Sequence, residues 1–157
     1  MPMTMRSLLT AAALLMLAGC GPIGGTKHPI NPPNASIQQL DVLRDGRWKI
    51  QLRLENFSDT TVHYGALKAS LRVGGEAAAD LAFNLDMDIP GENADIFETV
   101  ITPSPDAHRA FVSDVKLPGG AAYEIKGTIN IPASGKDYKF EHKSHLSPVP
   151  GISDEYR

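Results

Sequence analysis

Cysteine is almost absent from this chain, because its 157 residues include a single one, Cys20. One cysteine cannot form an internal disulfide, and it cannot build a cluster of thiolate ligands around a metal ion. Any folded domain must therefore be stabilised by packing and hydrogen bonds rather than by covalent links between segments.

Long apolar runs are also missing. The longest spans residues 8–17, well below the roughly 20 residues that a membrane-spanning helix needs. It follows Arg6 and ends at Leu-Ala-Gly-Cys, so it has the form of a secretory signal, and its end resembles the bacterial lipobox. We expect residues 1–19 to be a signal peptide and Cys20 to carry a lipid that anchors the chain to a membrane. The alternative is an ordinary cleaved signal beside an incidental cysteine.

The residues that follow Cys20 indicate a tether and a cellular location. Residues 21–34 are half proline and glycine, a composition typical of a linker, so we assign residues 20–34 to a tether. Gly21 stands where bacterial sorting uses aspartate to retain lipoproteins in the inner membrane. We therefore predict a location in the bacterial cell envelope, on the outer membrane and facing the periplasm.

Basic residues are too few to attract nucleic acid. The chain has 15 Lys and Arg against 18 Asp and Glu, and removal of residues 1–19 takes away Arg6 and no acid. Aromatic residues make up only 6% of the chain and lie on apolar faces, so they do not form a platform for stacked bases. A nucleic-acid partner is not expected.

Catalytic signatures are missing as well. The sequence has no Gly-x-Ser-x-Gly elbow, P-loop or Gly-x-Gly-x-x-Gly motif. Ser104, His108 and Asp114 lie close in sequence, but their spacing on one short helix does not order a nucleophile, a base and an orienting acid. We predict no enzyme activity, no catalytic residues and no small-molecule substrate.

Two patterns suggest metal ligands and fail on inspection. His142 and His145 are three residues apart on an expected strand, so they point to opposite faces. Residues 86–95 begin like a calcium loop, but Pro90 and Phe97 stand at the fifth and twelfth positions, where such a loop needs oxygen ligands. No metal or cofactor is predicted. A looser calcium site in this acidic loop stays open beside its interpretation as a solvated loop.

The clearest pattern in the sequence is the alternation of residues 48–57. Trp48, Ile50, Leu52 and Leu54 fall on one face, and charged or polar residues fall on the other. A period of two is typical of a strand with one buried and one solvated side. Burial of these four side chains contributes on the order of 6 to 12 kcal/mol if a second layer covers them.

Other segments predict a neighbouring strand for this central strand and further strands that can form the second layer. Asp45-Gly46 predicts a tight hairpin between a strand at residues 36–43 and the central strand. Strands are also expected at residues 62–73, with a bulge at Gly65, and at 77–85, where Ala77 begins the inward-facing set. Further strands are expected at residues 94–102, 123–131 and 138–142. Ser104 predicts the start of one helix over residues 105–115.

The expected architecture is all-β: an antiparallel immunoglobulin or fibronectin III-like β-sandwich of about seven strands with one short helix. It occupies residues 35–146. Residues 147–157, which include Pro148 and Pro150, are expected to form a loose C-terminal tail.

Four motifs resemble those of one known family. They are Leu-Arg-Leu-Glu-Asn-Phe from Leu52, Leu-Arg-Val-Gly-Gly from Leu71, Ile-Pro-Gly-Glu-Asn-Ala-Asp-Ile from Ile89 and Tyr-Glu-Ile-Lys-Gly-Thr-Ile from Tyr123. In order and spacing they are similar to the late embryogenesis abundant (LEA) type 2 domain, also called the water-stress and hypersensitive-response (WHy) domain. Phe57 departs from the pattern, since the family usually has proline after this asparagine.

The resemblance implies a fibronectin-like sandwich and protection under desiccation, cold or other stress, by association with client proteins or membrane. It implies no catalytic residues, and the binding residues stay unknown. An alternative is an envelope adaptor lipoprotein that binds a protein partner by strand addition or through loops. An enzyme or metal protein is the third hypothesis.

Overall fold

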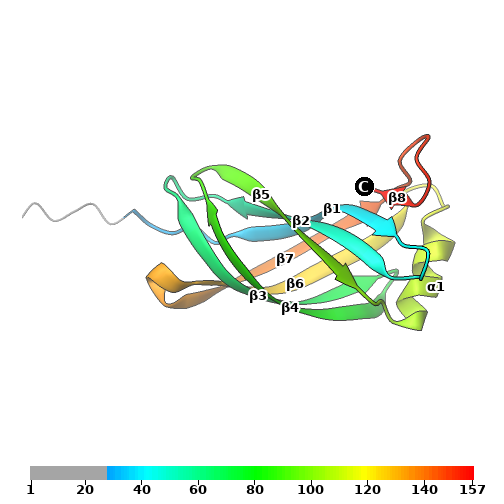
Figure 1. The fold of residues 1–157 in the computed structure, drawn as a ribbon, viewed down its shortest axis with the longest axis horizontal. Helices are drawn as coiled ribbons and strands as arrows, with labels where there is room; N and C mark the ends of the chain where they lie inside the picture. The colour runs from blue at the N-terminus through cyan, green and yellow to red at the C-terminus, as the bar shows by residue number, and fades with distance from the viewer. Residues whose placement is uncertain (1–27) are drawn as a thin grey trace, which may run out of the picture.

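The computed structural model describes residues 28–157, so the predicted signal peptide and Cys20 lie outside the described residues. Two four-stranded antiparallel sheets stack face to face, with strand orders β5-β2-β1-β8 and β4-β3-β6-β7 (Figure 1). The predicted all-β sandwich is confirmed, with eight strands instead of about seven. The elements in chain order are β1 (Asn34–Val42), β2 (Trp48–Asn56), β3 (Val62–Val73), β4 (Glu76–Ile89), β5 (Asn93–Ile101), α1 (Pro105–Asp114), β6 (Ala121–Ile131), the 3-10 turn η1 (Pro132–Ser134), β7 (Lys136–Leu146) and β8 (Glu155–Tyr156).

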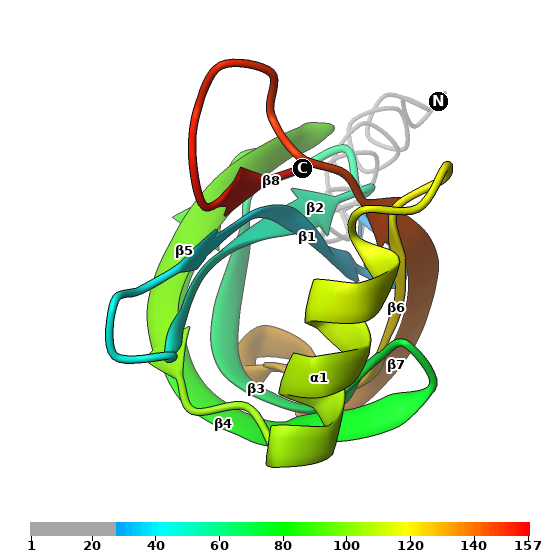
Figure 2. The ribbon, with the colours of Figure 1, turned by 90° about the vertical axis from the view of Figure 1, so that its right-hand side faces the viewer.

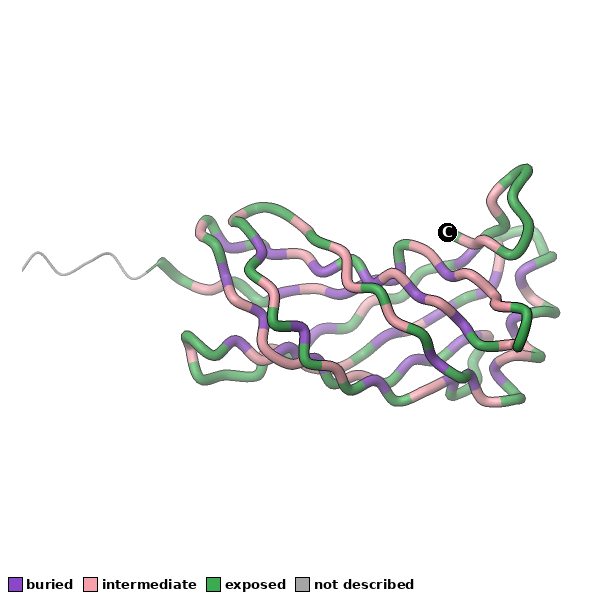
Figure 3. Tube along the Cα trace, in the orientation of Figure 1, coloured by how far each residue is buried: buried purple, intermediate pink, exposed green. Residues whose placement is uncertain are grey.

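β2 is the central strand that its alternation predicts. Its four inward side chains, from Trp48 to Leu54, are completely buried, whereas Lys49, Gln51 and Arg53 face solvent on the outer side. The same alternation of buried and exposed positions continues along the neighbouring strands (Figure 3). The core therefore lies between the inward faces of β2, β3 and β6.

Bulges shift the register of several strands. The predicted irregularity at Gly65 is confirmed, because the pairing of β3 with β4 slips between Tyr64 and Ala66. A second slip follows Leu71, and it turns Ala78 inward and leaves Ala77 exposed. The prediction that Ala77 begins the inward-facing set of β4 was therefore wrong. A slip between Ile37 and Gln39 explains why the alternation of β1 is poor in the sequence.

One end of the sandwich is covered by α1 (Figure 2). Ser104 caps the helix as predicted, since its hydroxyl accepts a hydrogen bond from the N–H of Ala107 at 3.2 Å. Phe111 of the helix packs on Trp48, with ring centroids 5.2 Å apart. The helix thus closes the core at the end where β2 begins.

The C-terminal segment is ordered, contrary to the expected loose tail. Residues 155–156 form β8, which pairs with Leu40 and Asp41 of β1. Tyr156 also packs edge-on against Phe111, with centroids 4.8 Å apart. The prediction gave weight to the two prolines and missed that an aromatic residue near the end can fill the space beside the helix.

Among the helices of the described residues, none is both long and apolar enough to cross a membrane.

The central strand gives a test of the core. Leu52→Ala should lower the free energy of unfolding by roughly 2 to 5 kcal/mol, because it removes a buried side chain and leaves a cavity. Arg53→Ala, one position along on the solvated face, should change it by less than about 1 kcal/mol. Urea denaturation followed by circular dichroism measures both, and the reverse ranking would mean that β2 faces the other way.

Candidate functional site

The residues considered for nucleophilic catalysis do not come together. Ser104 donates its hydroxyl hydrogen bond to the carbonyl of Ala77 at 2.6 Å, in addition to capping α1. His108 lies over the ring of Trp48, with centroids 6.4 Å apart. In the described part of the chain, the hydrogen bonds of histidine rings go to Asp59, Asn34 and Asp88 and not to a serine or threonine hydroxyl.

The two histidines near the end of β7 are separated as their spacing predicts. His142 pairs with buried Ile125 and turns toward the space between the sheets, where its ring lies 6.0 Å from that of Tyr123. His145 pairs with Ala122 on the outer face. The two rings therefore belong to different surfaces.

The acidic segment of residues 86–95 extends over the end of β4, its turn and the start of β5. His63 of β3 lies between two of its carboxylates, 3.4 Å from Asp86 and 2.8 Å from Asp88. All three side chains are substantially exposed. Within residues 28–157, no group of three or more His, Cys, Asp or Glu side chains is arranged to hold a metal ion.

A polar cluster built on the buried side chains of Asn56 and Ser58, which we call the loop knot, joins the two turns at the end opposite α1. Its members are Asn56, Ser58, Gly91 and Asn31. The Asn56 amide donates to the carbonyls of Thr60 and Ile89, each at 2.9 Å, and its oxygen accepts from the N–H of Ser58 at 2.9 Å. One side chain thus holds the β2–β3 loop against the β4–β5 turn.

The remaining members of the loop knot tighten this arrangement. A Cβ on Gly91 would lie 2.5 Å from the backbone of Asp59, so only glycine fits there. The Ser58 hydroxyl accepts from the N–H of Asn31 at 3.0 Å, and the Asn31 amide donates to the carbonyl of Phe57 at 2.6 Å. Sequence reasoning singled out the motifs that contain Asn56 and Gly91, but it could not show that the segment before β1 binds to the loop that follows Asn56.

Two tyrosines link the sheets through buried hydroxyls. Tyr64 of β3 donates to the carbonyl of Glu55 in β2 at 2.8 Å. Tyr123 of β6 accepts from the N–H of Ile37 at 3.1 Å and donates to the carbonyl of the same residue at 3.3 Å. Ile37 lies at the bulge in β1, so the Tyr123 hydroxyl binds backbone groups that the bulge displaces. Burial raises the pKa of both phenols.

The outer face of the β4-β3-β6-β7 sheet carries ion pairs and shallow depressions, one of about 430 Å³ lined in part by Arg72, Glu124, Lys143 and His145. Lys143 lies 3.0 Å from Glu141, and Lys126 lies 3.3 Å from it. Hydrogen bonds from these two lysines lower the pKa of Glu141. A depression of about 560 Å³ lies beside Lys126 and Glu141. Such a face can interact with other surfaces through charge.

Comparisons with known proteins give structural neighbours only. No family model matches the chain, and a search of curated proteins finds no match. An Arabidopsis thaliana protein, AT1g01470, solved in solution, aligns with a TM-score of 0.52 at 12% identity, covering 79% of this chain and 87% of its own. This likeness shows a shared fold.

Two further solved structures align less well. A crystal structure of a protein from Archaeoglobus fulgidus has a TM-score of 0.44 at 14% identity, covering 77% of this chain and 98% of its own. A putative LEA protein, At2g46140.1, solved in solution, has a TM-score of 0.45 at 15% identity, covering 71% of this chain and 67% of its own. The neighbours thus include a protein described as LEA-like.

The buried phenols predict how stability depends on alkaline pH. The unfolded chain ionises its tyrosines near pH 10, whereas the folded chain keeps Tyr64 and Tyr123 protonated to higher pH. The unfolded state then binds fewer protons, so the free energy of unfolding should fall above about pH 10, by up to about 1.4 kcal/mol per pH unit for each tyrosine.

Denaturation between about pH 7 and 12 measures this effect. Tyr64→Phe and Tyr123→Phe should each flatten the alkaline slope and lower stability at neutral pH by roughly 1 to 2 kcal/mol. Tyr138→Phe is the matched control for neutral pH, because the Tyr138 hydroxyl forms no hydrogen bond between the sheets within residues 28–157. An alkaline slope that stays the same in both variants would contradict the role given to these phenols.

Proposed function

We propose that this chain is a membrane-anchored, non-catalytic lipoprotein of the bacterial cell envelope whose LEA type 2-like domain protects proteins or membrane during stress. The observation that carries the proposal is the position of the resembling motifs. Asn56, from the first motif, hydrogen-bonds the carbonyls of Ile89 and Pro90, from the third. Residues far apart in the sequence that match one family pattern therefore meet in the fold.

The other motifs also have structural roles. Gly74 and Gly75 adopt positive φ angles of 58° and 81° in the turn between β3 and β4, as tight hairpins require. Tyr123 joins the sheets, and a Cβ on Gly127 would lie 2.0 Å from the carbonyl oxygen of Lys68. The residues of the motifs thus have roles in the fold, which supports the family resemblance. None of these roles is catalytic.

Phe57 departs from the family pattern without disturbing the loop knot. Its side chain is 52% exposed, and its carbonyl accepts from Asn31. The neighbouring Asn56 side chain keeps its hydrogen bonds to the carbonyls of Thr60 and Ile89. The substitution therefore places an apolar ring on the surface at the end opposite α1.

The anchor proposal rests on the lipobox-like sequence before Cys20, and the fold adds a constraint on distance. His28 is exposed, as expected of a linker residue, and it lies 3.0 Å from Asp59, in the β2–β3 loop. Eight residue steps separate Cys20 from His28, which allows at most about 29 Å. A lipid at Cys20 would therefore keep the loop knot and Phe57 near the bilayer, with α1 at the far end.

Lipidation is tested by mass spectrometry of the mature N-terminus. We expect Cys20 to be the first residue and to carry acyl chains, and we expect the chain in the membrane fraction. Cys20→Ser should remove the lipid mass and release the chain from that fraction. A mature terminus at another residue, or an unmodified Cys20, would contradict the anchor.

Protection is tested with residues 28–157. This fragment keeps His28 and Asn31, which lie before β1, bind the β2–β3 loop and are called the strap below. This fragment should protect a labile enzyme from inactivation by freezing or drying, in proportion to molar ratio and in the presence of a chelator. Its acidic charge should keep it soluble at the concentrations required. An inert protein of equal size at equal mass is the control, and equal protection by the two would remove support for the proposal.

An adaptor lipoprotein is the second candidate function. The observation that favours it is that β4 and β5, two long strands, each pair on one side only within the described residues. Such edges accept strands from other proteins. This candidate needs no protective activity.

A further inference from the structure

Two of the long edge strands, β4 and β5, lie on the same side of the sandwich, and the third, β7, ends its sheet on the other side. β4 ends one sheet and β5 ends the other, and the turn at Pro90–Gly91 connects them (Figure 1). On the opposite side, Asn34 of β1 lies 3.5 Å from His142 of β7, and β8 pairs with Leu40 and Asp41 of β1. Within residues 28–157, neither β4 nor β5 pairs with a further strand on this side, where the two lie next to each other (Figure 2).

The pairing of the strands fixes which groups of β5 face outward. The N–H of Val42 bonds the carbonyl of Asp154 on the β8 side, so Trp48, which pairs with Val42, directs its backbone groups toward β5. Trp48 pairs with Ile101, and every second residue of β5 from there also bonds β2. The N–H and C=O groups left at the free edge belong to Ala94, Ile96, Glu98 and Val100.

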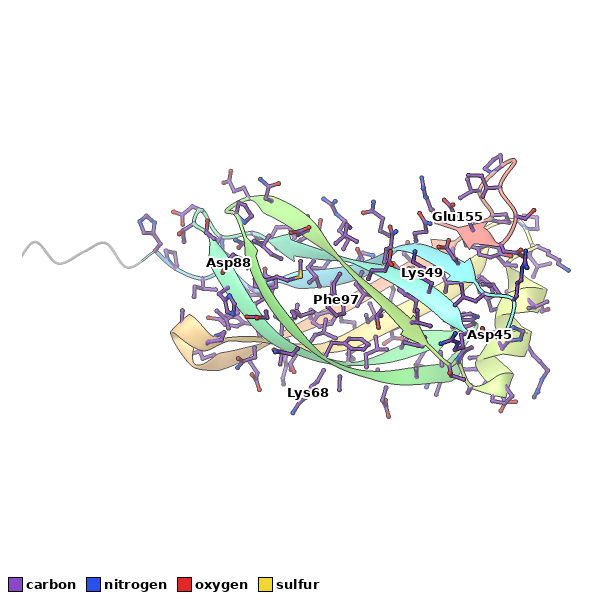
Figure 4. All side chains as sticks on the ribbon, in the orientation of Figure 1. Asp45, Lys49, Lys68, Asp88, Phe97 and Glu155 are labelled. Atoms are coloured by element: carbon purple, nitrogen blue, oxygen red, sulfur yellow. The ribbon has the colours of Figure 1, made fainter. Side chains whose placement is uncertain are left out.

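Three of the four side chains on the outer face of β5 are apolar, and the fourth, Glu98, lies 3.1 Å from Lys49 of β2. Val100 is 44% exposed, and Ala94 and Ile96 are partly exposed beside it. On the inner side, Phe97 meets Phe83 of β4, with ring centroids 5.4 Å apart, and fills the space between the two edges (Figure 4). An added strand would therefore find apolar contacts on its outer face and a closed core behind it.

The two edge strands and the turn between them carry acidic side chains without cations of their own. Residues 73–107 contain eight of the 18 acidic side chains and none of the 15 Lys and Arg or five His. This stretch includes both edge strands and the turn between them. Neighbouring elements pair with some of these acids, since Lys49 lies 3.1 Å from Glu98 and Arg109 contacts Asp106, but Asp95 has no ion pair within residues 28–157. The potential along this side favours a cationic ligand and opposes a second copy of the same edge.

Asp95 connects the charge to the edge. Its carboxylate accepts from the N–H of Ile96 at 2.7 Å, one of the donors that an added strand would use. The Asp95 side chain is exposed and lies on the inner side of the strand, because its partner is buried Leu54. A lysine or arginine next to Asp95 would draw the carboxylate away and free this N–H.

We propose that the free edge of β5 binds an extended segment of a partner protein in which lysine or arginine alternates with apolar residues. The cationic side chains lie next to Asp95, the apolar ones cover Ile96 and Val100, and the backbone adds a fifth strand to the sheet of β2. When the added strand has no cationic side chain at this position, the Asp95 carboxylate stays hydrogen-bonded to the Ile96 N–H, and that N–H is not available to the strand. The proposal names a partner class for the adaptor candidate, and it holds or fails independently of any protective activity.

The test uses the full chain in detergent micelles and a labelled peptide of nine residues, the length of β5, in which lysine and valine alternate. Fluorescence anisotropy should show binding that weakens as salt increases. A peptide with glutamate in place of lysine should not bind. Asp95→Asn should weaken binding about fivefold, whereas Asp80→Asn, which removes the same charge from the outer face of β4, should weaken it by much less.

Methylated peptides separate strand addition from attraction by charge alone. Methyl groups on the valine backbone nitrogens, which face β5 in this pairing, should weaken binding roughly a hundredfold, because each blocks a main-chain hydrogen bond. The same groups on the lysine nitrogens, which face away, should be tolerated. Equal effects of the two methylation patterns, no effect of Asp95→Asn, or a chain that dimerises through β5 and ignores the peptide would overturn the proposal.

Discussion

The sandwich depends on keeping two sheets in register across a core that no covalent bond crosses. In the described residues, the Tyr64 and Tyr123 hydroxyls supply polar links between the sheets, and both bind backbone groups rather than side chains. Packing alone holds sheets together but tolerates small slides, whereas a hydrogen bond to a fixed backbone atom does not. Tyr123 also binds Ile37 at the bulge of β1, so one hydroxyl sets the alignment of the sheets and satisfies an irregular strand.

Much of this fold can be predicted from the sequence because the alternation of residues along β2, β3, β6 and β7 is regular. The failures occur where a bulge changes the phase, as at Ala77 and Ala78, or where a distant contact decides the structure. The C-terminal segment is of the second kind, since Tyr156 is ordered by Phe111 and by the edge of β1. Nothing local in a sequence with two prolines indicates either partner.

The candidate sites show the same division. Spacing along the chain correctly separates His142 from His145 and assigns Ser104 to a helix cap. It cannot reveal that Asn31 binds the β2–β3 loop, or that acidic residues collect on the side where the edges of β4 and β5 lie. Both depend on which strands become neighbours. The pairing of one carboxylate with one edge N–H, at Asp95 and Ile96, also depends on β5 being the last strand of its sheet.

The strap formed by His28 and Asn31 also determines how the domain carries tension. A pull on the chain before His28 first loads the contacts to Asp59, Ser58 and Phe57 and then acts along β1. The hydrogen bonds between β1 and β2 run across the strands, so a force along β1 shears many of them at once, whereas a sideways pull would break them one by one. Mechanical load between the N-terminal segment and the rest of the fold is thus shared by the whole ladder, and the domain resists extraction in the direction in which a tether would pull it.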